Sequence, residues 1–365
     1  MLAFVFGAIM ILALGANPVD GLAAMIDGAF GTGNRVAATA VRATPLLLVG
    51  AGITIAFRAS VINIGGEGQI IAGALLSTAI ALAIPDTPRI FLIPLVILGG
   101  LIGGGIWGAI PGVLKAYASV NEILSTIMLN LVAIQLMNYL LRGPMIDPIE
   151  VNGSRIPQTE RLSDNAALPT LVEGSRLHLG VPMALVAAVL VYIVLFRTPM
   201  GFRLRAVGHN PDAARAAGIN VEKNIVSALS MSGALCGLAG VTLVFGSESL
   251  RLVTDGGSAG FTGSAGFNGI VAALFGGLHP LWTIPSAFLF GSLLTGATEL
   301  QRELQIPNAL AISLNGLIVL FVVSSDKVRN WLNRMLDRRS GFTNDTQPSS
   351  IDPDPAVVEA VEGDL

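Results

Sequence analysis

Long apolar runs recur along this 365-residue chain, and they constrain its fold more than any other feature of the sequence. About ten such runs are present, at roughly 1–18, 43–62, 66–85, 90–114, 122–141, 180–198, 224–246, 262–279, 281–300 and 308–325. Each is close to the ~20 residues that an α-helix needs to cross the hydrocarbon core of a bilayer. Strand-like alternation is missing, and a helix in lipid pairs its own backbone groups. The runs therefore predict an all-α membrane protein of about ten transmembrane helices.

The composition favours lipid over water as the surroundings of the chain. Only 12% of the residues are charged, whereas a typical soluble domain has about 25%. The N-terminal run MLAFVFGAIMILALGA has no basic residues before it, so we interpret it as a first spanning helix and not as a signal peptide. The single cysteine, Cys236, excludes an internal disulfide framework. No basic patch with interleaved aromatic residues points to nucleic acid.

The positions of Lys and Arg predict how the chain is oriented. An even number of spans puts both termini on one side. Placing them in the cytoplasm leaves 12 of the 21 Lys and Arg residues inside, including all three lysines. Residues 142–179 then form an extracytoplasmic loop, and residues 199–223 form the largest internal cytoplasmic loop. We predict a transmembrane domain over 1–325 and an acidic cytoplasmic tail over 326–365 that is disordered at its end.

Two glycine patterns predict how the helices pack. The run GGLIGGGIWGAIPG over 99–112 contains overlapping GxxxG pairs, and Gly233 and Gly237 repeat this spacing, which allows close approach of helix backbones. In addition, GEGQIIAGAL from Gly66 resembles GFNGIVAALF from Gly266. These two helices would run in opposite directions, as in an inverted repeat of helices 2–5 and 7–10. Chance similarity between helices rich in Ala, Gly and Ile is the alternative.

Polar residues also occur within the apolar runs. Glu122, Thr126 and Asn130 have the spacing i, i+4, i+8, which puts them on one face of a helix. Asn315 is alone in the last run. Such groups are costly in lipid and should face the bundle interior or a wet cavity. Hydrogen bonding between helices and lining of a substrate path both remain open as explanations.

The cytoplasmic loop contains the signals of a short helix in PDAARAA. Asn210 can cap this helix, Pro211 suits its first position, Asp212 complements its N-terminus, and Gly218 can end it. The helix has a face of small alanines, so it is either a docking element or simply a surface helix. No enzyme is indicated, because the three histidines lack metal-ligand spacing and no lysine follows a P-loop glycine.

Four blocks of sequence together resemble one family, the permeases of bacterial nucleoside and simple-sugar ABC importers. These blocks are NIGGEGQIIAGA, SVNEILSTIMLNLVA, TPMGFRLRAVGHNPDAARAAGI and GFNGIVAALFGG, in the family's order, within a resemblance over about residues 15–325. The group includes ribose and branched-chain amino acid permeases, and the resemblance implies the fold of a type II ABC importer permease. The NIGxEGQ form is more similar to the nucleoside-type permeases than to the ribose or galactose ones.

The resemblance implies a multi-pass subunit of the bacterial inner membrane that pairs with a second, different permease. A separate cytoplasmic ATPase would use ATP with Mg, a binding lipoprotein would deliver substrate from outside, and this chain itself would hold no cofactor or metal. The segment resting on the ATPase would comprise Asn210, Pro211, Asp212, Ala213, Ala214, Ala217 and Gly218. The alternatives are a ribose-type sugar ABC permease and an ion-driven secondary transporter.

The stretch RASVINIGGEGQ interrupts the apolar pattern most strongly. Its glycines allow turns and close approach, so we predict that a helix begins near Glu67, with Asn63 as a cap and Arg58 as the partner of Glu67. Glu67 then either fixes a junction between helices, which we favour, or contacts a ribose hydroxyl. The candidates for the substrate path are Asn63, Glu67, Gln69, Glu122, Thr126, Asn130, Phe267, Asn268 and Asn315.

Overall fold

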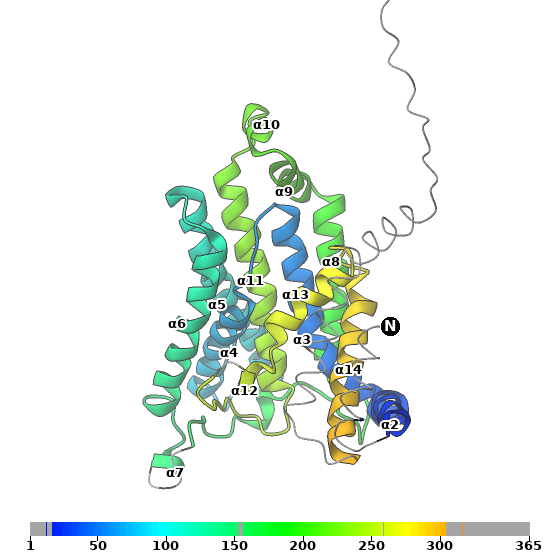
Figure 1. Cartoon of the computed structure of the whole chain (residues 1–365). Helices are drawn as coiled ribbons and strands as arrows, with labels where there is room; N and C mark the ends of the chain where they lie inside the picture. The colour runs from blue at the N-terminus through cyan, green and yellow to red at the C-terminus, as the bar shows by residue number, and fades with distance from the viewer. Residues whose placement is uncertain are drawn as a thin grey trace, which may run out of the picture. The chain divides into compact units, whose positions relative to one another are not determined.

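A computed structural model describes residues 12, 17–151, 153, 156–257, 259–303 and 316 of the chain. Within these residues the predicted all-α class is confirmed, since the β-structure is confined to two isolated bridges, Gln158–Val253 and Thr170–His178. The helices are α2 (Pro18–Phe30), α3 (Gly33–Arg58), α4 (Gly66–Ala83), α5 (Arg89–Ala118), α6 (Glu122–Arg142), α7 (Pro148–Val151), the 3-10 turn η1 (Asp164–Ala166), α8 (Gly180–Arg197), α9 (Pro199–His209), α10 (Pro211–Ala216), α11 (Val221–Phe245), α12 (Ala259–Thr262), α13 (Ala265–Phe275) and α14 (Thr283–Glu303) (Figure 1).

Six described helices, α3, α4, α5, α6, α8 and α11, are long and apolar enough to cross a membrane. They match six of the predicted runs. The run at 308–325 and nearly all of 1–18 lie outside the described residues, as does the tail over 326–365. The count of about ten spans is not confirmed by the described residues.

The prediction of a full span over 262–279 is wrong. Its helix, α13, has 11 residues, which extend about 16 Å, roughly half of the hydrocarbon core. The remainder forms a break at Gly263 and Ser264, both with positive φ, and a turn at Gly277 and Leu278. Local glycine chemistry therefore overrides the apolar pattern at both ends of this helix.

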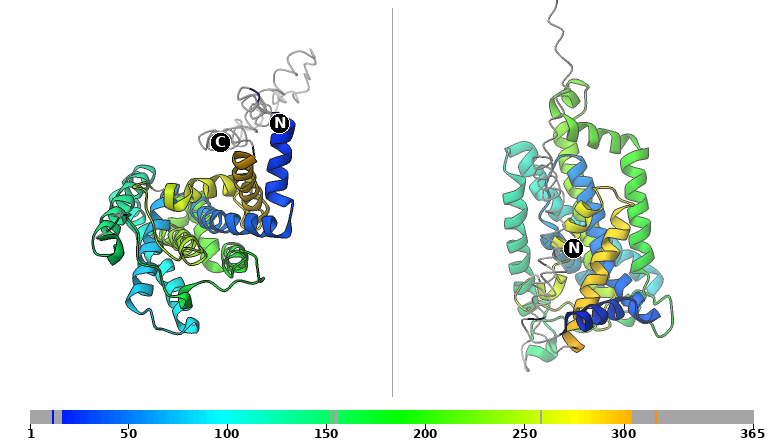
Figure 2. Two further views of the ribbon diagram at one scale, coloured as in Figure 1. Left: turned by 90° about the horizontal axis from the view of Figure 1, so that it is seen from below. Right: turned by 45° about the vertical axis from the view of Figure 1, so that its right-hand side comes forward.

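The helix α2 is absent from our sequence prediction. Asn17 accepts a hydrogen bond from the N–H of Val19 at 3.0 Å, and Pro18 takes the first helical position, so the helix begins with ordinary capping chemistry. It lies across the bundle and not along it (Figure 2). Its small residues pack on the end of α14, where Gly28 contacts Glu299.

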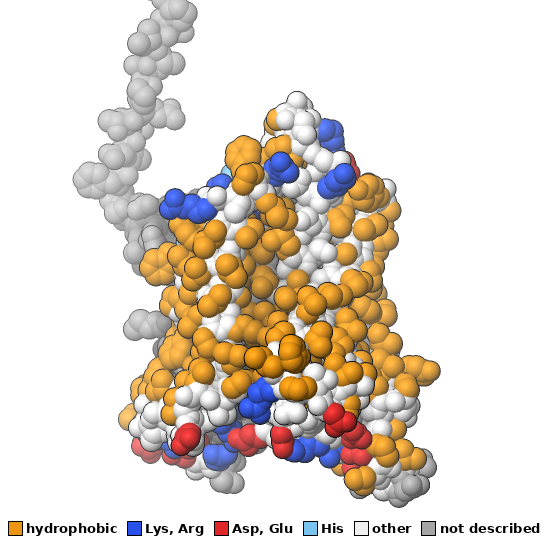
Figure 3. Space-filling model, turned by 180° about the vertical axis from the view of Figure 1, so that it is seen from behind, with side chains coloured by type: hydrophobic (Ala, Val, Ile, Leu, Met, Phe, Trp, Pro, Cys, Tyr) orange, Lys and Arg blue, Asp and Glu red, His pale blue; other side chains and the backbone are white. Residues whose placement is uncertain are grey.

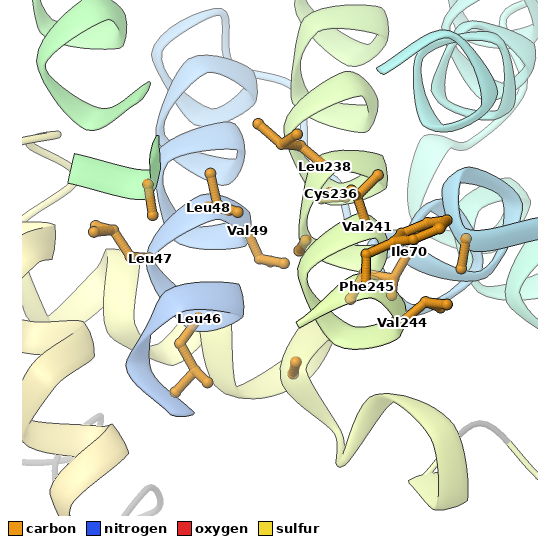
Figure 4. Close-up of a cluster of buried hydrophobic side chains, with 14 of the residues drawn as sticks. Leu46, Leu47, Leu48, Val49, Ile70, Cys236, Leu238, Val241, Val244 and Phe245 are labelled. Atoms are coloured by element: carbon orange, nitrogen blue, oxygen red, sulfur yellow. The ribbon is translucent and has the colours of Figure 1, made fainter. Parts of the chain in front are cut away.

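Glycines allow the central helix α11 to pack closely against α5 and α4. A Cβ built on Gly104 of α5 would lie 2.2 Å from the carbonyl oxygen of Gly233 on α11. One built on Gly73 of α4 would lie 2.3 Å from the Cα of Gly237. The GxxxG prediction is confirmed, because only hydrogen fits at these positions. Branched and aromatic side chains fill the rest of the core, as at Val49, Ile70 and Phe245 (Figure 4).

The packing of six helices follows the predicted inverted repeat. In that repeat α3, α4 and α5 correspond to α11, α13 and α14, and corresponding helices run in opposite directions (Figure 1). Accordingly, α5 packs on α11 as α14 packs on α3, and α4 packs on α11 as α13 packs on α3. The fourth pair stays a prediction, since the run at 308–325 is not described.

The two long connecting segments lie at opposite ends of the helix bundle. The end with α7 belongs to 142–179, and the end with α9 and α10 belongs to 199–223 (Figure 1). On the face seen in Figure 3, apolar side chains cover the middle and charged side chains gather at the two ends. This distribution is the one expected of described residues that span a bilayer.

Candidate functional site

The chain between α3 and α4 turns back into the bundle. Residues 59–65 are not helical, yet Asn63 is completely buried. The α4 helix then begins at Gly66, which contacts Gly266 at the start of α13. Val49, nine residues before the end of α3, contacts Gly269. At 1.5 Å per residue this places the start of α13 about 14 Å or more inside the bundle. The N-termini of α4 and α13 therefore meet at depth.

Glu67 joins these two helices. Its side chain is 1% exposed, and it lies in the first turn of α4. One carboxylate oxygen accepts a hydrogen bond from the Thr262 hydroxyl, and the other accepts one from the N–H of Phe267 at 3.2 Å. A carboxylate on α4 thus acts as the N-terminal cap that α13 lacks from its own sequence.

Two asparagines, Asn63 and Asn130, stabilise the α4 side of this junction between the N-termini of α4 and α13. Asn130 of α6 accepts from the N–H of Gly68 at 2.8 Å and donates to the carbonyl of Ile64 at 3.0 Å, so α4 is capped by another helix. Asn63 donates to Gln69 and to Ser232 of α11, both at 2.9 Å. The prediction of Asn63 as the helix cap is wrong, because its oxygen accepts from Gly65 and Gln69 and not from the first turn.

The predicted partner of Glu67 is also wrong. The Arg58 guanidinium donates to the carbonyl of Leu278 at 3.0 and 3.1 Å and lies over the Phe196 ring. Arg58 therefore holds the C-terminal turn of α13, whereas Glu67 holds its N-terminus. Two residues that are nine positions apart fasten both ends of the same helix.

The remaining substrate-path candidates separate into three groups. Thr126 is buried and donates to the Glu122 carbonyl at 2.7 Å, while the Glu122 carboxylate pairs with Lys115 at 2.8 Å. Phe267 and Asn268 lie in the first turn of α13, and the Phe267 side chain is 47% exposed. Asn315 lies outside the described residues. The structure therefore brings Asn63, Glu67, Gln69 and Asn130 into one junction and leaves Glu122 at the end of its helix.

A cavity of about 430 Å³ lies on the other side of the α12–α13 break. Arg42 and Thr298 line it, together with Phe261 and Thr262 of α12. Sequence reasoning missed Arg42, although an arginine within an apolar helix is a known marker of a functional path. None of our substrate-path candidates lines this cavity among the described residues.

The segment 199–223 forms an arm of two helices, α9 and α10. Asn210 accepts from the N–H groups of Asp212 and Ala213, both at 3.0 Å, and Gly218 follows with a φ of +79°, so the predicted cap, helix and stop are confirmed. Ala214, however, is 4% exposed, because it packs inside the arm against Val207 and Val221. The outward face is formed by Ala213, Ala216 and Ala217.

Two contacts stiffen the arm. Arg215 binds Glu222 of α11 at 2.8 Å, and this hydrogen bond raises the pKa of Arg215 above its ordinary value. The Arg205 guanidinium of α9 lies 5.2 Å from the centre of the Phe196 ring, which also carries Arg58. The arm is therefore attached to α11 through Arg215 and to α8 through Arg205.

Comparison with known proteins agrees with this architecture. A family model described as "Branched-chain amino acid transport system / permease component" matches residues 35–323. The chain belongs to this family. It is 35% identical to a guanosine ABC transporter permease of Bacillus subtilis (strain 168) over 90% of this chain and 92% of the relative. It is 33% identical to a nucleoside ABC transporter permease of Lactococcus lactis subsp. cremoris (strain MG1363), over 87% of each chain.

A third relative carries a different substrate in its name. It is a glucose ABC transporter permease of Haloferax volcanii, 31% identical over 92% of this chain and 89% of the relative. Both bacteria named above also have a second, more distant matching permease with the same substrate in its name. The chain is therefore a permease of the ABC transporter class and a multi-pass membrane protein.

Proposed function

We propose that this chain is the permease subunit of a nucleoside importer driven by a separate ABC ATPase that uses ATP and Mg. The observation that carries the proposal is the α9–α10 arm, which presents a small, exposed alanine face at one end of the bundle. An ion-driven carrier needs no docking element of this kind. Relatives named for guanosine and nucleosides support nucleosides as the cargo.

The arm faces the cytoplasm in this proposal. Both described lysines lie at the arm end of the bundle, because Lys115 is in the last turn of α5, whose Gly112 contacts Val226, and Lys223 is in the first turn of α11, which follows the arm. Arg203 and Arg205 of α9 and Arg215 of α10 belong to the arm itself. Described arginines are found at both ends, so the orientation is supported by the position of the lysines, since Lys and Arg near span ends are favoured on the cytoplasmic side. The end with α7 would then face outward in a bacterial inner membrane and receive a substrate-binding lipoprotein. The paired permeases of the two bacterial relatives support a heterodimer with a second permease.

A sugar importer is the second candidate, because the Haloferax relative is named for glucose. The two are separated by uptake into proteoliposomes that contain the complete transporter with its own ATPase, second permease and binding protein. We expect ATP-dependent uptake of tritiated guanosine and adenosine that excess glucose or ribose does not inhibit. Uptake of glucose or ribose alone would make the sugar candidate the correct one.

The proposed orientation predicts which ends react from outside the cell. Cysteine replaces Glu173 in one variant and His209 in another, both exposed positions, in a Cys236→Ser background. An impermeant maleimide should label Glu173→Cys in intact cells and should label His209→Cys only after the cells are permeabilised. The opposite pattern would reverse the assignment of the two ends.

The arm predicts that coupling depends on Ala217. The Ala217→Glu variant should stay folded, because this side chain is exposed, yet uptake should fall about tenfold, since a misplaced charge at an interface costs a few kcal/mol. Ala217→Ser is the matched control and should retain uptake. The measurement is uptake normalised to permease, with co-purification of the ATPase. If Ala217→Glu shows normal uptake and still binds the ATPase, the arm is not the docking site.

A further inference from the structure

The cavity beside the α12–α13 break has the features of a small-molecule site. Its volume of about 430 Å³ falls within the roughly 300–1,000 Å³ of typical ligand sites. It lies between helices of both halves of the repeat, and its walls are mostly apolar with a few polar groups. Its lining includes Arg42, Phe261, Thr262, Thr298 and Gln301.

The break between α12 and α13 is a second, independent sign that this cavity is a binding site. Gly263 lines the cavity with a φ of +59°, and the next residue, Ser264, has a φ of +61°. Non-helical backbone within a membrane bundle is tolerated where protein buries it or where it borders a wet cavity. Short, glycine-interrupted helices of this kind border the binding sites of many transporters built from inverted repeats.

Arg42 supplies hydrogen-bond donors to the cavity. Its Nη1 atom donates to the Leu294 carbonyl at 2.7 Å and to the Thr298 hydroxyl at 2.6 Å, which fixes the guanidinium against α14. A guanidinium has five N–H donors, and among the described residues no carboxylate lies within ion-pair distance of Arg42. The remaining donors are therefore available to acceptors on a neutral ligand.

The walls favour a flat heteroaromatic ligand over a sugar or an amino acid. Phe261 offers an aromatic surface, and Gln301 offers an amide that can both donate and accept. No carboxylate is found among the described lining residues, so the ammonium of an amino acid would have no counter-ion. The largely apolar walls offer few acceptors, so the several hydroxyl groups of a sugar would be buried here without hydrogen-bond partners.

We propose that this cavity binds the base of the transported nucleoside, with Phe261 against its ring, Arg42 donating to a ring carbonyl and Gln301 on its edge. This inference rests on the proposed function and adds the site at which the cargo is recognised. Thr262 lines the cavity and donates to Glu67, so the ligand site and the helix junction share a residue. Movement of α12 on binding would therefore act directly on α4.

The test uses the complete transporter in proteoliposomes with tritiated guanosine. Phe261→Leu keeps an apolar side chain and removes the aromatic ring. It should raise KM about tenfold, because stacking of a base on an aromatic ring is worth roughly that factor or more. Phe288→Leu is the matched control, since Phe288 lies on α14, contacts Phe30 and does not line the cavity. Its KM should be unchanged.

Photolabelling of the unmodified transporter provides a second measurement that does not depend on a variant. An 8-azido nucleoside should label peptides from α3, α12 or α14, whose residues line the cavity, and excess guanosine should prevent this labelling. If labelling is confined to helices that do not line the cavity, or if the KM of Phe261→Leu is unchanged, the site is wrong although nucleoside transport remains. A transporter that takes up no nucleoside would overturn the proposed function and the site with it.

Discussion

Replacing Gly104 by alanine should remove most of the folded permease from the membrane, whereas the same change at Gly105 should not. A Cβ at position 104 would lie 2.2 Å from the Gly233 carbonyl oxygen and 2.6 Å from the Gly237 Cα, so α5 and α11 would have to separate. Overpacking of this kind typically costs about 1–3 kcal/mol and sometimes more. The contact is between backbones, which no side-chain rotation can relieve.

Gly105 is the control because it is the next residue of the same helix. A Cβ there would meet the Ala234 Cβ at 3.5 Å, which is an ordinary van der Waals contact. Alanine also has the higher helix propensity, so Gly105→Ala should be neutral or slightly stabilising. The measurement is the amount of monodisperse permease extracted from membranes and its melting temperature. Equal losses in the two variants would show that these glycines do not set the distance between α5 and α11.

The sequence was sufficient for features that depend on composition and local chemistry. The six long spans follow from their length and apolarity, and α10 follows from Asn210, Pro211 and Gly218, which act within a few residues of one another. The glycine pairs of α5 and α11 follow from their spacing. These predictions succeeded because each needs only neighbouring residues.

Features that depend on distant partners could not be predicted in this way. The start of α13 is capped by Glu67, about 200 residues earlier in the chain, and nothing near Ala265 reveals this. Arg58 was assigned to Glu67 because they are close in sequence, yet it binds the carbonyl of Leu278. Ala214 faces the interior of the arm for a similar reason, since its neighbours Val207 and Val221 come from flanking helices.

The cavity was missed because its residues are dispersed along the chain. Arg42, Phe261 and Gln301 belong to α3, α12 and α14, and no motif joins them. The signals that were present, an arginine in an apolar helix and a glycine after Thr262, acquire meaning once the inverted repeat brings these helices together. A search for arginines without a nearby acidic residue would have found Arg42 from the sequence.

Glu67 should prove to be a structural residue whose loss is severe. In Glu67→Ala the Phe267 N–H loses its bond to the carboxylate, and the Thr262 hydroxyl loses its bond to Glu67, within a buried site. Loss of a buried hydrogen bond to a charged group costs about 1–3 kcal/mol, so the loss of both bonds should destabilise the permease by roughly 2–6 kcal/mol. Glu67→Gln keeps an acceptor for Phe267 and loses only the charge at the helix N-terminus, which is worth up to about 2 kcal/mol. Its loss of abundance and melting temperature should be smaller.

A double substitution tests how much of this cost arises from the bond between Thr262 and Glu67. Thr262→Val replaces the hydroxyl by a methyl group of similar size and removes the same bond, so the losses in Glu67→Ala and Thr262→Val should be less than additive in the double variant. Uptake of ribo- and deoxynucleosides, normalised to assembled transporter, separates the junction from a ligand role. If Glu67 instead contacts a ribose hydroxyl, Glu67→Gln would keep normal abundance and melting temperature and would lose uptake of ribonucleosides selectively. A fixed ratio of ribo to deoxy uptake, together with less-than-additive losses in the double variant, would leave Glu67 as the carboxylate that caps α13.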